Sequence, residues 1–299
     1  MFRLFTTLFV LSIGCLAAAA EESEGEPHEA FYQELEVQRQ PQFRMQGIEL
    51  SQQLHYQIVS WFQLYEPDAA GNQSVVQEIR DATLIAADPL SQTVFADALA
   101  QLKGRQLKYR VAADGSIFQF TGYVNRQDPV NVAAEDVTGM LVSNVIDEDG
   151  WKELALLTLF QPPKDSPGAK PFDQPTRHDW GSLGSWYGDT RFQRGKRRGK
   201  LQGFGFVRQL QYLPPGNDAK DAKPATALQV RDAKFVAERA DGQIVFDTRS
   251  ERVTTAHEWF SAKGTVTANV LGSDIVIELH ERQQMAIRVK AERFVPRRP

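Results

Sequence analysis

Alternating apolar and polar residues on both sides of a short turn constrain this chain more than any other feature. The clearest case spans residues 265–290, where the turn is Leu271-Gly272-Ser273. The apolar positions are Val266, Ala268 and Val270 before the turn and Ile275, Ile277 and Leu279 after it. A repeat of two places these side chains on one face of an antiparallel hairpin. The second strand would exceed the usual ten residues, so we expect a bulge near residues 282–284.

Similar turn signals recur along the chain and define the fold class. Asp114-Gly115 and Asp241-Gly242 are strong hairpin turns, and a basic turn over 195–199 separates two aromatic-rich segments, 180–192 and 201–213. Helical spacing is confined to residues 88–104 and 128–160. We therefore predict an α+β protein, predominantly antiparallel β, with curved, half-barrel-like sheets in two halves and connecting helices.

This reading divides the chain into five segments. They are a signal peptide (1–20), a flexible acidic leader (21–44), a first β half with one helix (45–127), a helical connector (128–163) and a second β half (164–299). The leader is assigned from its acidic, Gln-rich composition.

The first 20 residues predict export. One early charge, Arg3, precedes an apolar run from Leu4 to Leu16 and then four alanines, which is the pattern of a cleavable secretory signal. The run is shorter than the roughly 20 residues that a bilayer-spanning helix needs. A periplasmic or extracellular protein is therefore expected.

Cys15 leaves an alternative open. It follows Gly14 and resembles the lipid-attachment site of a lipoprotein signal, which would make the protein membrane-anchored. Cys15 is also the single cysteine of the chain, so cleavage after Ala20 would leave no disulfide, thiolate ligand or cysteine nucleophile.

The charge balance argues against nucleic acid as a partner. Lys and Arg number 34 against 38 Asp and Glu, a formal net charge of −4, whereas nucleic-acid binders carry a basic footprint. One basic stretch, Arg191–Lys200, interrupts this balance. It is either a solvated hairpin tip or a docking site for an anionic surface such as lipid head groups.

Catalytic and metal-binding patterns are weak. His178 and Asp179 could form a base and its orienting group, with Ser182 or Ser185 as nucleophile, but neighbours on a strand point to opposite faces. The five histidines show no metal-ligand spacing. We predict no catalytic residue, metal or cofactor, and a hydrolase centred on His178 ranks third among the functions considered.

Aromatic side chains in strands are the remaining candidates for ligand binding. They could line a pocket for an apolar ligand or fill the core. The candidates are Trp61, Phe118, Phe120, Trp180, Trp186, Phe204, Phe206 and Trp259.

Short motifs also carry a resemblance. The segment L-K-G-R … D-G-S-I (102–117), the run F-Q-P-P (160–163) and the Trp-rich second half resemble a family of uncharacterised exported β-rich bacterial proteins of planctomycete type. The layout is more distantly similar to the half-barrels of periplasmic lipoprotein carriers and other lipid-binding proteins. The resemblance implies an exported β fold and no specific activity.

Together these features favour a non-enzymatic exported envelope protein. The leading hypothesis is that a hydrophobic ligand or an envelope protein binds against a curved sheet. The alternative is a structural or interaction module of the cell surface that uses a sheet edge and the basic stretch.

Overall fold

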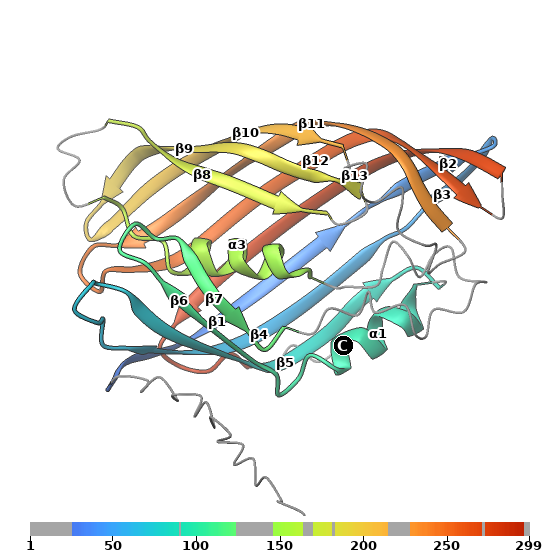
Figure 1. Cartoon of the computed structure of the whole chain (residues 1–299). Helices are drawn as coiled ribbons and strands as arrows, with labels where there is room; N and C mark the ends of the chain where they lie inside the picture. The colour runs from blue at the N-terminus through green and yellow to red at the C-terminus, as the bar shows by residue number, and fades with distance from the viewer. Residues whose placement is uncertain are drawn as a thin grey trace, which may run out of the picture.

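Antiparallel pairing joins every strand of the protein into a single sheet (Figure 1). The computed structural model describes residues 26–89, 91–123, 146–163, 170–180, 183–214, 228–270 and 273–295. The main path of the sheet runs β7-β6-β5-β4-β1-β13-β12-β11-β10-β9-β8, and β2 and β3 extend from β13. The strands are β1 (Pro27–Arg39), β2 (Gln42–Met45), β3 (Ile48–Ser51), β4 (Leu54–Tyr65), β5 (Gln73–Ala87), β6 (Gln106–Val111), β7 (Ile117–Thr121), β8 (Phe172–Asp179), β9 (Ser185–Arg198), β10 (Leu201–Leu213), β11 (Leu228–Asp247), β12 (Arg252–Val270) and β13 (Ser273–Lys290).

The predicted fold class is confirmed. The sheet is antiparallel, curved and open rather than closed, and the described residues contain two helices, α1 (Gln92–Ala100) and α3 (Glu148–Thr158). Strands from both expected halves belong to this one sheet, and β1 joins them by pairing with β4 of the first half and β13 of the second. The expected helical segment over 128–145, the signal peptide and Cys15 lie outside the described residues.

The expectation of a flexible leader over residues 21–44 is wrong from Pro27 onward. This segment forms β1, in the middle of the sheet between β4 and β13, and buries Phe31, Leu35 and Val37. Glu34 and Glu36 lie on the opposite face of the strand, where Glu34 pairs with Arg288. Composition concealed the alternation, because every second residue is polar.

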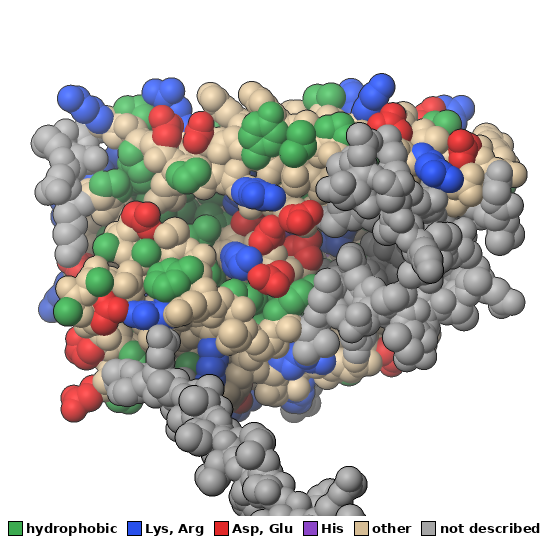
Figure 2. Space-filling model, in the orientation of Figure 1, with side chains coloured by type: hydrophobic (Ala, Val, Ile, Leu, Met, Phe, Trp, Pro, Cys, Tyr) green, Lys and Arg blue, Asp and Glu red, His purple; other side chains and the backbone are tan. Residues whose placement is uncertain are grey.

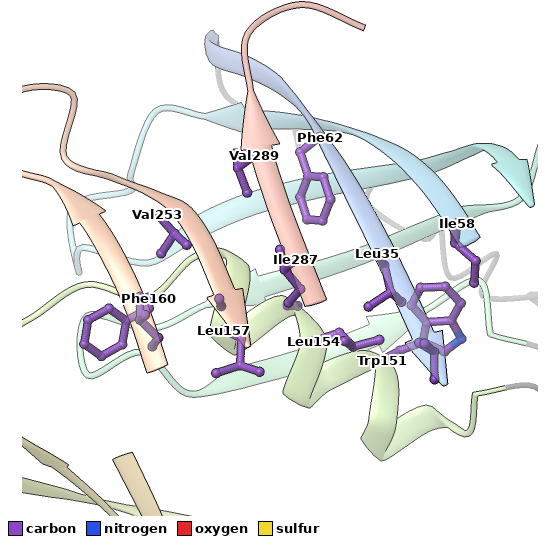
Figure 3. Close-up of a cluster of buried hydrophobic side chains, with 14 of the residues drawn as sticks. Leu35, Ile58, Phe62, Trp151, Leu154, Leu157, Phe160, Val253, Ile287 and Val289 are labelled. Atoms are coloured by element: carbon purple, nitrogen blue, oxygen red, sulfur yellow. The ribbon is translucent and has the colours of Figure 1, made fainter. Parts of the chain in front are cut away.

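Helix α3 packs on the inner face of the curved sheet and closes the main core. Asp147 caps the helix by accepting a hydrogen bond from the Gly150 amide at 2.7 Å. We call the apolar residues around the helix the α3 core, which Figure 3 shows with the helix lying across strands from both halves of the chain. Its central members are Leu35, Ile58, Phe62, Trp151, Leu154, Leu157, Phe160, Phe204, Phe206 and Ile287.

Two contacts fix α3 in place. The Phe160 ring lies 5.1 Å from the Phe192 ring and 5.2 Å from the Phe204 ring, centroid to centroid. At the other side of the core, the buried amide of Gln33 donates a hydrogen bond to the Thr158 hydroxyl at 2.5 Å. A buried polar group needs such a partner, so this bond sets how the helix sits on β1.

The bulge expected near residues 282–284 is absent from β13, which pairs with β12 without a register shift. The β11–β12 ladder instead shifts register between Val230 and Asp232, between Ala237 and Arg239 and between Val245 and Phe246. The shift at Ala237/Arg239 switches the inward positions of β11 from even-numbered residues such as Ile244 to odd-numbered ones such as Phe235, and the shift at Val230/Asp232 switches them back. The position of the bulge is therefore set by the point at which the apolar residues of β11 switch between even and odd positions, and not by the length of the strand.

Candidate functional site

The inner face of the sheet carries two apolar zones with charged groups between them. On β10 the even-numbered residues share one face. Phe204 and Phe206 belong to the α3 core, whereas Leu210 and Tyr212 belong to a second cluster. Arg208 lies between them on the same face.

We call the second zone the aromatic cluster, defined by Trp180, Trp186, Tyr212, Phe235 and Phe260. Its rings meet edge to face. The centroid distances are 5.3 Å for Trp180–Trp186, 5.2 Å for Trp186–Tyr212, 5.2 Å for Tyr212–Phe235 and 5.4 Å for Trp180–Phe235. The Phe235 ring lies directly over Gly264, where a Cβ atom would clash with it. A glycine at this position lets the ring lie flat against β12.

The aromatic cluster differs from the α3 core in the elements that form it and in the hydrogen bonding of its buried polar groups. All its members come from strands or from the β8–β9 connection. Trp186 is 2% exposed, and its indole Nε1 has no hydrogen-bond acceptor among the described residues. An unsatisfied buried donor costs about 1–3 kcal/mol, so a donor left in an apolar cluster favours an acceptor supplied from outside the protein.

Charged side chains from four elements separate the two zones, and we call them the ionic row. His178 Nε2 lies 3.0 Å from Asp147 Oδ2, and His178 Nδ1 lies 3.3 Å from Glu153 Oε1. Arg208 then joins Glu153 (3.1 Å) to Glu258 (2.9 Å). Figure 2 shows acidic and basic side chains gathered over α3 in the middle of this face.

The environment of the ionic row shifts the pKa of its members. Burial opposes ionisation of Glu153, but Arg208 and His178 outweigh it and lower the pKa of this carboxyl to about 2. Burial likewise disfavours the charged form of His178, yet Glu153 and Asp147 hold its pKa well above the ordinary value. Burial raises the pKa of Glu258, although Arg208 counteracts it. His178, Glu153 and Arg208 therefore form a charged unit that ties α3 to β8 and β10.

Arg208 also carries a free donor toward the inner face. Its side chain is 8% exposed, and its Nε has no hydrogen-bond partner within the described residues. Sequence reasoning missed this residue, although the signal was present: Phe204, Phe206, Arg208, Leu210 and Tyr212 place one arginine at an apolar, inward position of β10. A charge in such a position is rare unless it is paired.

The structure gives His178 a different partner from the one expected for a hydrolase. His178 contacts Asp147 and Glu153 rather than Asp179. The Asp179 amide instead donates a hydrogen bond to Asp149. Trp186 is the residue opposite His178, so the neighbouring Ser185 points to the other face. Ser182 lies outside the described residues.

The aromatic residues proposed as ligand-binding candidates lie in four places. Trp180 and Trp186 belong to the aromatic cluster, Phe204 and Phe206 to the α3 core, and Phe120 packs against that core beside Tyr109. Trp61 and Trp259 alternate with inward residues and so lie on the outer face, under Arg80 and Arg239 respectively. Phe118 stacks against Arg110. Tyr212, Phe235 and Phe260 complete the cluster and were not among the candidates.

The described residues contain neither a metal-binding group nor a helix that could span a membrane. They hold no group of three or more His, Cys, Asp and Glu side chains placed to bind a metal ion. Neither of the described helices has the length and apolar character to cross a membrane.

Comparison with known proteins gives no family for the chain: no family model and no curated protein matches it. Among solved structures it is similar to lipovitellin, in a structure of lipid–protein interactions in that protein, with 12% identity and a TM-score of 0.43. That match covers 92% of this chain but 27% of the lipovitellin chain, so the protein spans about a quarter of that relative's length.

Two further solved structures show weaker likenesses. A DUF1329 family protein from Desulfovibrio piger has 8% identity and a TM-score of 0.17, over 86% of this chain and 83% of its own. The outer membrane protein OprG from Pseudomonas aeruginosa has 5% identity and a TM-score of 0.21, over 90% and 99%. Export and membership of a planctomycete-type family stay predictions.

Proposed function

We propose that the protein is a non-enzymatic exported protein that binds an amphipathic ligand with an acyl chain on the inner face of its sheet. The apolar part of the ligand packs on the aromatic cluster. Acceptor oxygens of the ligand, such as an ester carbonyl, receive hydrogen bonds from the indole of Trp186 and, further along β10, from Nε of Arg208. The observation that carries the proposal is the unsatisfied donor of Trp186 inside an otherwise apolar, ring-lined zone.

The charges nearby favour an uncharged acceptor over an anionic head group. Arg208 is flanked by Glu153 and Glu258, so its positive charge is already balanced within the protein. A ligand carboxylate would meet these two acidic side chains at short range, which is unfavourable in a buried setting. An ester or amide oxygen takes the free N–H groups without that cost.

The test is a binding titration with a dansyl-labelled acyl methyl ester, accompanied by mass spectrometry of lipid extracted from the purified protein. Trp186→Phe keeps an aromatic ring but removes the donor, and we expect about tenfold weaker binding, the value of one hydrogen bond to a buried group. Trp61→Phe is the matched control, because this indole lies on the outer face, and it should leave binding unchanged. Equal affinity of the Trp186→Phe variant and the unchanged protein would contradict the proposal.

A further inference from the structure

The hairpin between β9 and β10 carries a concentrated positive charge. Residues 191–200 contain six basic residues and no acidic one, and residues 195–200 are all exposed. The turn is held in shape: Gln202 donates a hydrogen bond to the Gly195 carbonyl at 2.8 Å, and Arg197 Nε donates to the Gly199 carbonyl at 3.0 Å. Gly199 has a φ of 60°, which favours glycine at this corner.

Within the described part of the chain, no carboxylate neutralises the charges at the end of this hairpin. Arg191 and Lys200, at the two ends of the stretch, pair with Asp173 and Asp247. Lys196, Arg197 and Arg198 have no carboxylate partner among the described residues. We call these three residues the basic tip. Three adjacent like charges repel one another, so the tip adds nothing to the stability of the isolated protein.

The position of the basic tip limits what can bind there. It lies at the end of the sheet where β1 begins, because β9 ends and β10, β12 and β1 start at the same side (Figure 1). The whole chain carries a net charge of −4. A partner that wraps around the protein, as nucleic acid does, would meet this excess of acidic groups. A broad, flat anionic surface can approach the tip from this end of the sheet.

We propose that the basic tip docks the protein on the surface of a membrane that contains anionic phospholipids. Short Lys/Arg clusters bind such surfaces through the charge of the head groups, and the attraction weakens within a Debye length. Docking at this end also brings the start of β1, at Pro27, to the membrane side. The proposal does not depend on the ligand proposed for the inner face.

The experiment is flotation of the purified protein with vesicles of phosphatidylcholine, with and without phosphatidylglycerol. We expect binding that needs phosphatidylglycerol and weakens with added salt. The variant Lys196→Glu/Arg197→Glu/Arg198→Glu should lose at least about tenfold in apparent affinity, since each basic residue near the surface contributes several-fold. A variant with glutamine at the same three positions should show a smaller loss and guards against misfolding of the first.

The control makes the same change in net charge elsewhere. Arg231→Glu/Lys234→Glu/Arg282→Glu alters three exposed residues away from the tip, and its affinity should fall by less than about threefold. Equal losses in the two triple variants would overturn the proposal, because net charge and not the tip would then govern binding. Absence of binding to the phosphatidylglycerol vesicles would overturn it as well, and so would undiminished binding of both tip variants.

Discussion

The α3 core and the aromatic cluster lie on the same face of the same sheet and yet are completed in different ways. The α3 core is closed by a helix whose polar groups are satisfied, through the Asp147 cap and the Gln33–Thr158 hydrogen bond. The aromatic cluster is built from strands and retains an unsatisfied indole donor. The α3 core is therefore built for stability, whereas under the proposed function the aromatic cluster gives up some stability to keep a hydrogen-bond donor available for a ligand. Four predictions test this difference.

The largest effect is expected from Trp151→Ala in the α3 core. Trp151 is 1% exposed, and its truncation leaves a cavity under the helix. The free energy of unfolding should fall by about 3–5 kcal/mol, as for other buried tryptophans. Urea unfolding followed by circular dichroism measures it. A loss below about 1 kcal/mol would mean that α3 does not close the core.

Glu153→Gln should have the next largest effect, because it removes the carboxylate shared by His178 and Arg208. Two buried positive charges, His178 and Arg208, then each lose one of their two carboxylate partners, which costs up to about 3 kcal/mol. Glu148→Gln is the control: this half-exposed residue pairs with Lys152 on the same helix, and such pairs contribute less than about 0.5 kcal/mol. Similar losses in the two variants would show that the ionic row does not hold α3 to the sheet.

The ionic row also predicts how stability depends on pH. The pKa of His178 is raised by Glu153 and Asp147, so the folded protein holds this proton more tightly than the unfolded chain. The contribution of His178 to the free energy of unfolding is therefore complete below a pH of about 6.5. It is lost as the pH rises through the raised pKa of His178 in the folded protein. Glu153, with its pKa lowered to about 2, contributes above pH of about 4.5 and loses this contribution as the pH falls toward 2.

Replacing His178 isolates the alkaline part of this profile. In His178→Gln the fall in stability on the alkaline side should flatten, while the acid side keeps the part of its slope that Arg208 gives to Glu153. Urea unfolding at a series of pH values checks this. An unchanged alkaline slope in the variant would place the titrating group elsewhere.

The smallest change in stability is expected for Trp186→Phe. The substitution removes an unsatisfied donor and retains a ring, so the free energy of unfolding should change by less than about 1 kcal/mol, with a small gain as the favoured direction. The same variant is expected to lose ligand affinity. A large loss of stability would show that packing of the Trp186 indole stabilises the fold as strongly as packing of the side chains in the α3 core.

Periodicity predicted the fold well, and composition predicted it poorly. The hairpins at Asp114-Gly115 and near 195–199 follow from local turn chemistry and alternation, and the structure contains an antiparallel pair at each. The hairpin predicted at Asp241-Gly242 is wrong, because both residues lie inside the continuous strand β11 and pair with β12. β1 was misread as a leader, because Glu34 and Glu36 dominate its composition while Phe31 and Leu35 carry the period of two. Strand pairing over long sequence separations, such as β1 with β13, has no local signal to predict it.

The candidate site was only partly accessible from sequence. Trp180 and Trp186 were named, but the residues that join them come from β10, β11 and β12, and their convergence depends on the register shifts in β11. The ionic row needs α3 to lie on β8 and β10, which is a tertiary arrangement. Only Arg208 gave a readable signal, as a charge at an inward position of an alternating strand.

The place of β1 in the middle of the sheet has a consequence for biogenesis. Tyr32 lies opposite Lys290, so the first strand that leaves the ribosome finds one of its two neighbours only when nearly the whole chain has been synthesised. Until then one edge of β1 is unpaired and can pair with other chains, which promotes aggregation. The sheet is completed only when this long-range strand pair has formed. Loss of β13 would also cut the sheet through its centre instead of trimming its rim.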